Sequence, residues 1–499
     1  MTIDATRLRG PWSAIRMMAG HELRLAWRSR VIPALATIVA ALCLTAATVS
    51  TARHRTEADQ RLRYQNAVGQ QFASQPDRHP HRVSHYGYLV FRPRAPLGFL
   101  DPGIEGFTGA SLFLEAHRQN LPTFSSASQG SSTERFGELS VSLVLQFLLP
   151  LFVLALAAVS ITREREDGTL PLLSMQGASW PVLVWGKLLG QLLVIGVVLL
   201  PAVLLCGAWL AAVYATVWTP DLLQRVVALL ATQLGLVIAC AAIGVTISAR
   251  AATSRQALMT VLSLWFLMWV VLPRALPAAA TAAHPTPARA SFESDVEARV
   301  RELGDSHNPD DPSFRRLRED TLARYGVSRV DDLPFNYGGL VMKEGEALTS
   351  AAYQQQLATL VDTYRQQEAW VQWAGLISPY LATRPLSMAL AGSDLPHQME
   401  FERQAEAYRY ALIQSLNDLH MNEVAAAADR YDGSFNGAPT RQRIDRAFFE
   451  TLPEFSYTAP DLRWALTQQS LGVWCFVWML SVSLGALWLT GRQRWQVRA

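Results

Sequence analysis

The chain has 499 residues, of which 50% are hydrophobic and 17% are charged, and its formal net charge is +3. This composition is too apolar for an ordinary soluble domain, and the net charge is too small to indicate a nucleic-acid-binding protein. The four cysteines all lie in apolar runs, which argues against a disulfide framework and against a cysteine-based zinc site. Lysine occurs only at Lys187 and Lys343, so almost every cation is an arginine.

Residues 1–30 are predicted to form an interfacial helix that precedes the first membrane span. Trp12 and Trp27 lie among arginines here, a pattern typical of a helix at a membrane surface whose cations meet anionic headgroups. No short apolar core with a small-residue cleavage site follows, so this segment is not interpreted as a signal peptide.

Six apolar runs approach the length of about 20 residues that an α-helix needs to cross a bilayer. They are 31–49, 141–161, 188–212, 226–248, 256–272 and 470–490. The predicted fold class is therefore a mainly α, polytopic membrane protein with six transmembrane helices. In the fourth run, Gln233 is expected to form a hydrogen bond between helices rather than to bind a substrate.

Two long polar segments, 50–140 and 273–469, interrupt these runs. Helical spacing recurs in the second segment over three stretches, 296–325, 348–373 and 399–431. The Ala/Pro-rich linker 273–290 is not expected to be helical. The two segments together are expected to build a largely helical extracytoplasmic domain.

The first polar segment contains a small group of potential metal ligands. His79, His81 and His85 lie near Asp77, and imidazole and carboxylate groups bind divalent ions. The alternative is a proline-punctuated surface loop in which a few histidines fall together by chance. Because no second ligand pair and no metal-specific spacing accompanies these residues, the loop interpretation is favoured and no metal site is predicted.

The polar stretch 162–187, between the second and third runs, has residues in an order that predicts a short helix. Gly168 suits a left-handed helix stop because it has no Cβ. Thr169 is then expected to cap a new helix, and Gly177 to end it. Such a helix would lie across the mouth of two membrane spans, where it could dock another protein.

The same stretch contains the order Glu-x-Glu-x-Gly-Thr-Leu, then Leu-Leu-Ser, then Gly-Lys at the start of the next span. The residues concerned are Glu164, Glu166, Gly168, Thr169, Leu170, Leu172, Leu173, Ser174, Gly186 and Lys187. This order resembles the cytoplasmic coupling segment of ABC-2-type transporter permeases. The chain departs from the family pattern after Leu-Leu-Ser, where it has Gly-Ala-Ser-Trp at 177–180 in place of a proline with a Ser-Arg pair.

The N-terminal helix shares this resemblance. Glu22, Arg24, Arg28 and Arg30 resemble the "elbow" helix that precedes the first span in ABC-2 permeases. The long segments after spans one and five are similar to those of a branch of the family with large extracytoplasmic inserts.

The resemblance implies a permease subunit that borrows its ATPase activity. No Gly-x-x-x-x-Gly-Lys-Ser/Thr phosphate loop and no catalytic constellation occur in the sequence, so the chain is not expected to be an enzyme. ATP and Mg²⁺ would be bound by a separate ATP-binding subunit, and the permease would pair with a second copy or a paralogue. The expected function is ATP-coupled movement of a substrate in the direction of export. The alternative is mechanotransmission to an envelope partner without translocation.

Arginine placement predicts the orientation. With six spans, the arginine-rich N-terminus, the 162–187 stretch and the C-terminal tail 491–499 share one side of the membrane. The positive-inside rule places that side in the cytoplasm. The expected location is therefore the bacterial cytoplasmic membrane, with membrane lipid as a partner, both termini inside and both long inserts outside.

Overall fold

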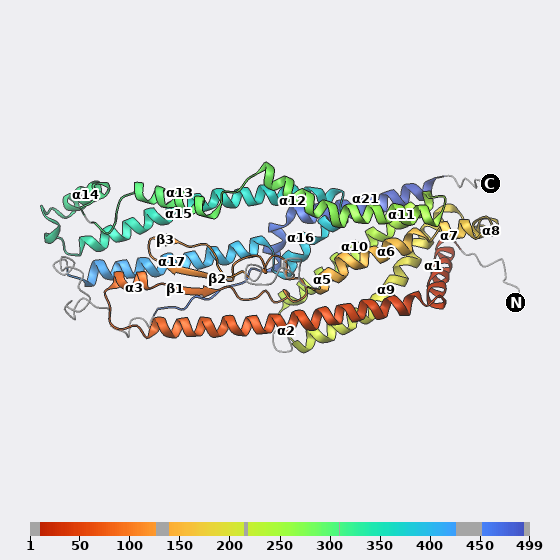
Figure 1. The fold of residues 1–499 in the computed structure, drawn as a ribbon, viewed down its shortest axis with the longest axis horizontal. Coiled ribbons are helices and arrows are strands. Elements are labelled where there is room, and N and C mark those ends of the chain that lie inside the picture. The colour runs from red at the N-terminus through yellow and green to blue at the C-terminus, as the bar shows by residue number, and fades with distance from the viewer. Residues whose placement is uncertain (1–9, 126–138, 214–217, 309, 426–451, 494–499) are drawn as a thin grey trace.

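The computed structural model describes residues 10–125, 139–213, 218–308, 310–425 and 452–493. The molecule is elongated, with α1, α8 and the end of α21 at one end and α3, α14 and a small sheet toward the other (Figure 1). The helices that span the membrane or flank the spans are α1 (Pro11–Arg28), α2 (Val31–Ala73), α5 (Val141–Leu143), α6 (Leu149–Ala158), α7 (Thr162–Glu166), α8 (Thr169–Met175), α9 (Trp180–Val213), α10 (Pro220–Arg250), α11 (Ser254–Trp265), α12 (Leu272–Ala283), α20 (Leu462–Gln468) and α21 (Ser470–Arg492). Two π-helical segments interrupt them, η3 (Val144–Leu148) and η4 (Phe266–Val271).

The described residues contain six helical stretches that are long and apolar enough to cross a membrane, which confirms the predicted fold class. These are Val31–Ala73, Val141–Glu166, Trp180–Ala212, Pro220–Arg250, Ser254–Ala283 and Ser470–Arg492. Their bounds differ most from the predicted spans at the first and fifth, where the helices continue into the polar segments.

Helix α2 does not stop at residue 49, where the apolar run ends. Its 43 residues span about 65 Å, roughly twice the thickness of the hydrocarbon layer. The polar half contains good helix formers and an ion pair at helical spacing, with Arg53 Nε 2.9 Å from Glu57 Oε1. The helix of the first span therefore continues as the first helix of the outer domain.

Two predictions for the second polar segment are wrong. The linker 273–290 is helical up to Ala283, because its alanines favour a helix even though Pro277 lies inside α12. The single helix predicted over 296–325 is broken into two. The chain turns at Gly304, which has a φ of +98°, and restarts at Pro312.

The outer domain joins both polar segments around one three-stranded antiparallel sheet, which the sequence analysis did not predict. The sheet consists of β1 (Tyr88–Phe91), β2 (Ser111–Glu115) and β3 (Arg118–Gln119). The helices of the outer domain are α3 (Pro80–Tyr86), α13 (Arg289–Glu302), α14 (Arg315–Tyr325), α15 (Tyr337–Trp373), α16 (Pro379–Ala391) and α17 (Leu395–Glu423). Strand residues Val90 and Leu114 are buried in one core with Phe401 and Ile413 of α17. The first insert thus packs directly on the second.

A π-helical turn in the second span is held by side chains from other helices. Pro150 has no amide hydrogen to donate to the Gln146 carbonyl four residues earlier, and Trp269 Nε1 donates to that oxygen at 2.7 Å. Gln233 Nε2 donates to the Leu145 carbonyl at 2.7 Å. Gln233 therefore forms the interhelical hydrogen bond that was expected of it.

A buried polar network connects the outer domain to this turn. The Asp101 carboxylate is 1% exposed, and both of its oxygens lie 2.6 Å from Arg384 Nη1. Ser387 Oγ donates to Asp101 Oδ2 at 2.5 Å and accepts from Gln146 Nε2 at 2.6 Å. The first insert, the second insert and the second span therefore meet at Asp101.

Replacing Arg384 by Ala should destabilise the protein by about 3–5 kcal/mol, because it leaves the buried Asp101 carboxylate without its cation. The matched control is Arg403→Ala, which removes a surface ion pair with Glu400 and should cost only about 0–1 kcal/mol. Denaturant unfolding of the purified protein in detergent measures both. Equal losses would contradict the role assigned to Asp101.

Candidate functional site at the coupling segment

The segment between the second and third spans contains two short helices joined by a glycine. Helix α7 ends at Glu166, and Gly168 has a φ of +69°, the left-handed conformation predicted from the sequence. Helix α8 then runs to Met175, and Gly177 follows it with a φ of +83°.

The prediction that Thr169 caps α8 is wrong. Thr169 is the first residue of the helix, and Gly168 is its N-cap. The Thr169 hydroxyl instead turns back and donates to the Glu164 carbonyl at 3.2 Å and to the Glu164 carboxylate. This contact fixes the angle between α7 and α8.

Lys187 lies at the centre of the site and binds two carboxylates. Its Nζ is 2.6 Å from Glu22 Oε1 on α1 and 2.5 Å from Glu164 Oε1 on α7. Gln191 Nε2 donates to the other Glu22 oxygen at 3.2 Å. Lys187 is only 3% exposed and Glu22 7%, so this ion pair lies away from water. The elbow helix and the coupling segment are thereby held on the same residue of α9.

Two glycines of α9 allow α1 to approach closely enough for this contact. A Cβ at Gly186 would lie 2.8 Å from Met18 Cβ, and one at Gly190 would lie 2.7 Å from Glu22 Cβ. Both distances are shorter than side chains tolerate, so only glycine fits at either position. The Gly-Lys pair of the sequence motif therefore has one structural purpose: Gly186 admits α1, and Lys187 binds it.

Two other charged residues of α7 bind neighbouring spans: Glu166 binds the start of α11 and Arg165 the end of α10. Glu166 accepts from the Ser254 backbone N–H at 2.8 Å and from Ser254 Oγ at 2.5 Å. The Arg165 guanidinium donates to the Ala249 carbonyl at 3.2 Å and also to the Ala251 carbonyl. Glu164 and Glu166 thus point to opposite sides, as their spacing predicts, and each one holds a different span.

The apolar residues of α8 divide into a buried and an exposed face. Leu170 is buried and Leu173 half-buried, whereas Leu172 is 55% and Met175 83% exposed. Ser174 is half-buried. Among the elbow residues, Glu22 is buried in the Lys187 network, and Arg24, Arg28 and Arg30 are exposed at the same end of the molecule. A short helix with exposed Leu and Met side chains suits a protein-docking surface.

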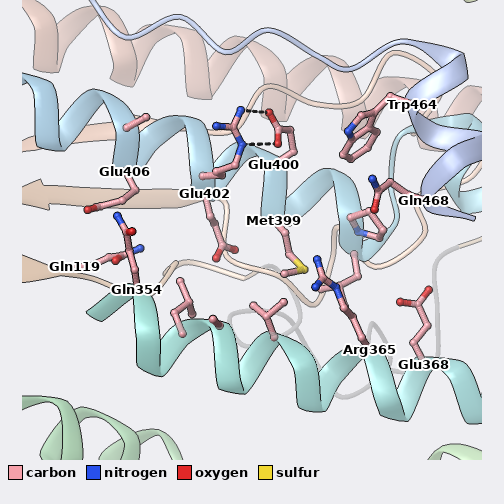
Figure 2. A pocket seen from close by; sticks show the side chains of 17 residues that line it. Gln119, Gln354, Arg365, Glu368, Met399, Glu400, Glu402, Glu406, Trp464 and Gln468 are labelled. Carbon is pink, nitrogen blue, oxygen red and sulfur yellow. Dashed lines mark hydrogen bonds and ion pairs between the residues drawn. The ribbon is translucent and has the colours of Figure 1, made fainter. Parts of the chain in front are cut away.

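A second candidate site is a cavity of about 650 Å³ between α15 and α17. Figure 2 shows Glu368, Glu402 and Glu406 facing it, with Glu400 paired to Arg403. Burial raises the pKa of Glu368 and of Glu402, whereas the hydrogen bond from Arg403 lowers the pKa of Glu400. The lining thus combines carboxylates with Arg365, Arg403 and apolar side chains, and no sequence pattern pointed to it.

The histidines considered in the sequence analysis lie at the far end of the outer domain. The structure brings His81 and His85 together with His117 and His307. The last two were missed because they are 32 and 222 residues beyond His85 in the sequence. The one local signal was the spacing of His81 and His85, which places two imidazoles on the same face of a helix.

Replacing Lys187 by Met should destabilise the protein by about 3–5 kcal/mol, since it leaves Glu22 and Glu164 together without their shared cation. The chain supplies a matched control in its other lysine. Lys343 pairs with Asp418 at 2.5 Å, but both side chains are more than one-third exposed, so Lys343→Met should cost about 0–1 kcal/mol. Chemical denaturation in detergent distinguishes the two. The assignment fails if Lys187→Met is no more damaging than Lys343→Met.

Comparison with known protein families agrees with this architecture. Residues 16–369 match the family described as ABC-2 family transporter protein, and residues 289–458 match a domain of unknown function, DUF3526. No curated protein matches the chain. Since the first match covers most of the chain and includes five of the six candidate spans, the chain belongs to the ABC-2 transporter family, as a multi-pass transmembrane permease subunit that works with a separate ATP-binding subunit.

Proposed function

We propose that this permease couples ATP hydrolysis by its partner subunit to the movement of a substrate across the membrane, in the direction of export. The observation that carries the proposal is the coupling segment. It presents the exposed Leu172 and Met175 outward, while Glu164 and Glu166 hold it to the spans through Lys187 and Ser254. The segment can therefore transmit a displacement from the ATP-binding subunit to the membrane spans.

The route of that push follows from the contacts. The ATP-binding subunit, with its ATP and Mg²⁺, docks on α8. Displacement of α8 moves α7, and the Lys187 network then carries α1 and α9 with it. The Glu166 contact with Ser254 draws α11 in the same direction. A second permease copy or a paralogue completes the complex, and the spans rock between inward-open and outward-open arrangements.

The orientation proposed is the one that exposed arginines favour. Arg28, Arg163, Arg250 and Arg255 are exposed at the ends of helices near α8, and basic residues next to spans favour the cytoplasmic side. This end of the molecule and both chain termini would then face the cytoplasm of a bacterial cell. The outer domain would stand on the opposite side of the cytoplasmic membrane.

A second candidate function is mechanotransmission to an envelope partner without translocation. The observation in its favour is that α2 continues without a break from the first span into the core of the outer domain, where Phe72 is buried. A movement of α2 would therefore move the outer domain directly. In both functions the coupling segment acts in the same way, and they differ in what the outer side does.

The orientation is testable by labelling in a variant from which the four native cysteines have been removed. Single substitutions Ser74→Cys and Ser415→Cys, both at exposed positions of the outer domain, should react with an impermeant maleimide in intact spheroplasts. Ala252→Cys, exposed in the loop between α10 and α11, should react only after lysis. The opposite pattern would overturn the proposed topology.

The docking role of α8 is testable with the double variant Leu172→Asp/Met175→Asp. Both side chains are exposed, so insertion and folding should be retained while an apolar contact with the partner is lost. Co-purification of the ATP-binding subunit and stimulation of ATP turnover by the permease should both fall strongly. The control is Gln176→Asp, an exposed polar neighbour. Full assembly and turnover in the double variant would show that the ATPase binds elsewhere.

A further inference from the structure

Six of the ten histidines of the chain gather at the end of the outer domain that lies away from α8. They are His79, His81, His85, His117, His307 and His420. Their elements, which include α3, the turn after β2 and the segment before α14, come from both polar inserts and lie toward the end opposite α1 (Figure 1). Four of them converge more closely: each of His81, His85, His117 and His307 offers a ring nitrogen, and these four atoms all lie within 4.8 Å of one another.

The local folds explain how these four rings meet. His81 and His85 are four residues apart on α3 and therefore share one face of the helix. His79 caps that helix, since its Nδ1 accepts from the His81 backbone N–H at 3.2 Å. His117 lies in the two-residue turn between β2 and β3, with a φ of +59° that is uncommon for a residue with a side chain. His307 comes from the second insert.

The spacing of the nitrogens suits a metal ion. His85 Nε2 lies 3.1 Å from His81 Nε2 and 3.5 Å from His307 Nε2. With metal–nitrogen distances of about 2.0–2.1 Å, a tetrahedral site places its ligand atoms about 3.3 Å apart. Small side-chain rotations would therefore bring all four rings into coordination.

Carboxylates lie behind two of the rings, and one of them forms a hydrogen bond to its ring. His307 Nδ1 lies 3.1 Å from Asp305 Oδ1, and His117 Nδ1 lies 3.3 Å from Glu346 Oε2. A carboxylate on one ring nitrogen orients the imidazole and directs the other nitrogen toward a metal. Among the described residues, both ring nitrogens of His117 are buried and neither has a hydrogen-bond partner; Nε2 lies on the side away from Glu346. It is the atom that a metal would satisfy.

Two of the four rings are also shifted toward the protonation state that metals require. Burial, reinforced by the neighbouring imidazoles, lowers the pKa of His81 to about 2, and burial likewise lowers the pKa of His85. Both rings are therefore neutral at physiological pH, and neutral imidazole is the form that coordinates.

We propose that His81, His85, His117 and His307 bind one divalent transition-metal ion, of the class to which zinc, copper, nickel and cobalt belong. A ligand set made only of imidazoles favours these metals and disfavours magnesium and calcium, which prefer oxygen ligands. The bound ion joins α3 and the β2–β3 turn of the first insert to the His307 segment of the second insert. His85 and His307 are exposed, so the ion can enter and leave from solvent.

The test uses the full-length protein in detergent, purified with an affinity tag that contains no histidine. Separate samples are stripped with a chelator, loaded with Zn²⁺, Cu²⁺, Ni²⁺ or Co²⁺, freed of excess metal and analysed by elemental mass spectrometry. At least one of these ions should be retained at one per chain and should raise Tm, whereas Mg²⁺ and Ca²⁺ should do neither. If Co²⁺ is retained, its visible absorption should report nitrogen coordination.

The key variant is His85→Ala/His307→Ala, which alters two exposed residues and should leave the Tm of the metal-free protein unchanged. It should lose the retained ion and the rise in Tm. Asp305→Asn, which changes only the carboxylate behind His307, should weaken binding by about tenfold. The matched control is His284→Ala, because His284 lies in the same polar insert but packs against Trp370, away from the cluster. The proposal is overturned if the wild type retains none of the four metals, or if the double variant retains as much metal as the wild type.

Discussion

Lys187 is buried and pairs with the buried carboxylate of Glu22 and the half-buried carboxylate of Glu164, so separating Glu22 from it would leave a buried charge without its partner. Such a contact resists being broken during a conformational change. In the proposed mechanism, α1, α7 and α9 therefore move as one unit. Gly186 is needed because α1 must cross α9 closely for Glu22 to reach the lysine.

The same constraint explains how a movement at α8 can reach the outer domain. Helix α9 packs along α2, and α2 extends about 35 Å beyond the hydrocarbon layer, into the core where Phe72 meets the sheet. A second connection exists at the Asp101 network, where Gln146 of the second span is linked to Ser387 of the second insert. The outer domain is thus joined to the spans by continuous helix and by buried charge. Its far end, where the histidines gather, is farthest from the spans, so a rotation of the outer domain would displace this end most.

Much of this architecture could be predicted from the sequence, because apolar runs near 20 residues long and a left-handed glycine are local signals. The left-handed conformation of Gly168 was predicted from one such signal, and the fold class was predicted from the apolar runs. What the sequence did not disclose depends on contacts between distant residues. Glu22 and Lys187 were each noted, yet nothing in the spacing pairs them, and Thr169 was misassigned because its hydroxyl binds Glu164 rather than its own helix. His117 and His307 join His81 only when the two inserts fold together.

The most direct test of the account is the distance between α1 and α8 during the ATPase cycle. Spin labels attached through Arg24→Cys and Gln176→Cys, both at exposed positions, can be measured by pulsed electron resonance in the complex with its ATP-binding subunit. If Lys187 holds α7 to α1 and Thr169 holds α8 to α7, the distance distribution should be narrow and the same without nucleotide and with trapped ATP, and it should broaden in Lys187→Met. A distance that shifts on ATP binding in the otherwise unaltered protein would contradict the account, as would a distribution that stays equally narrow without Lys187.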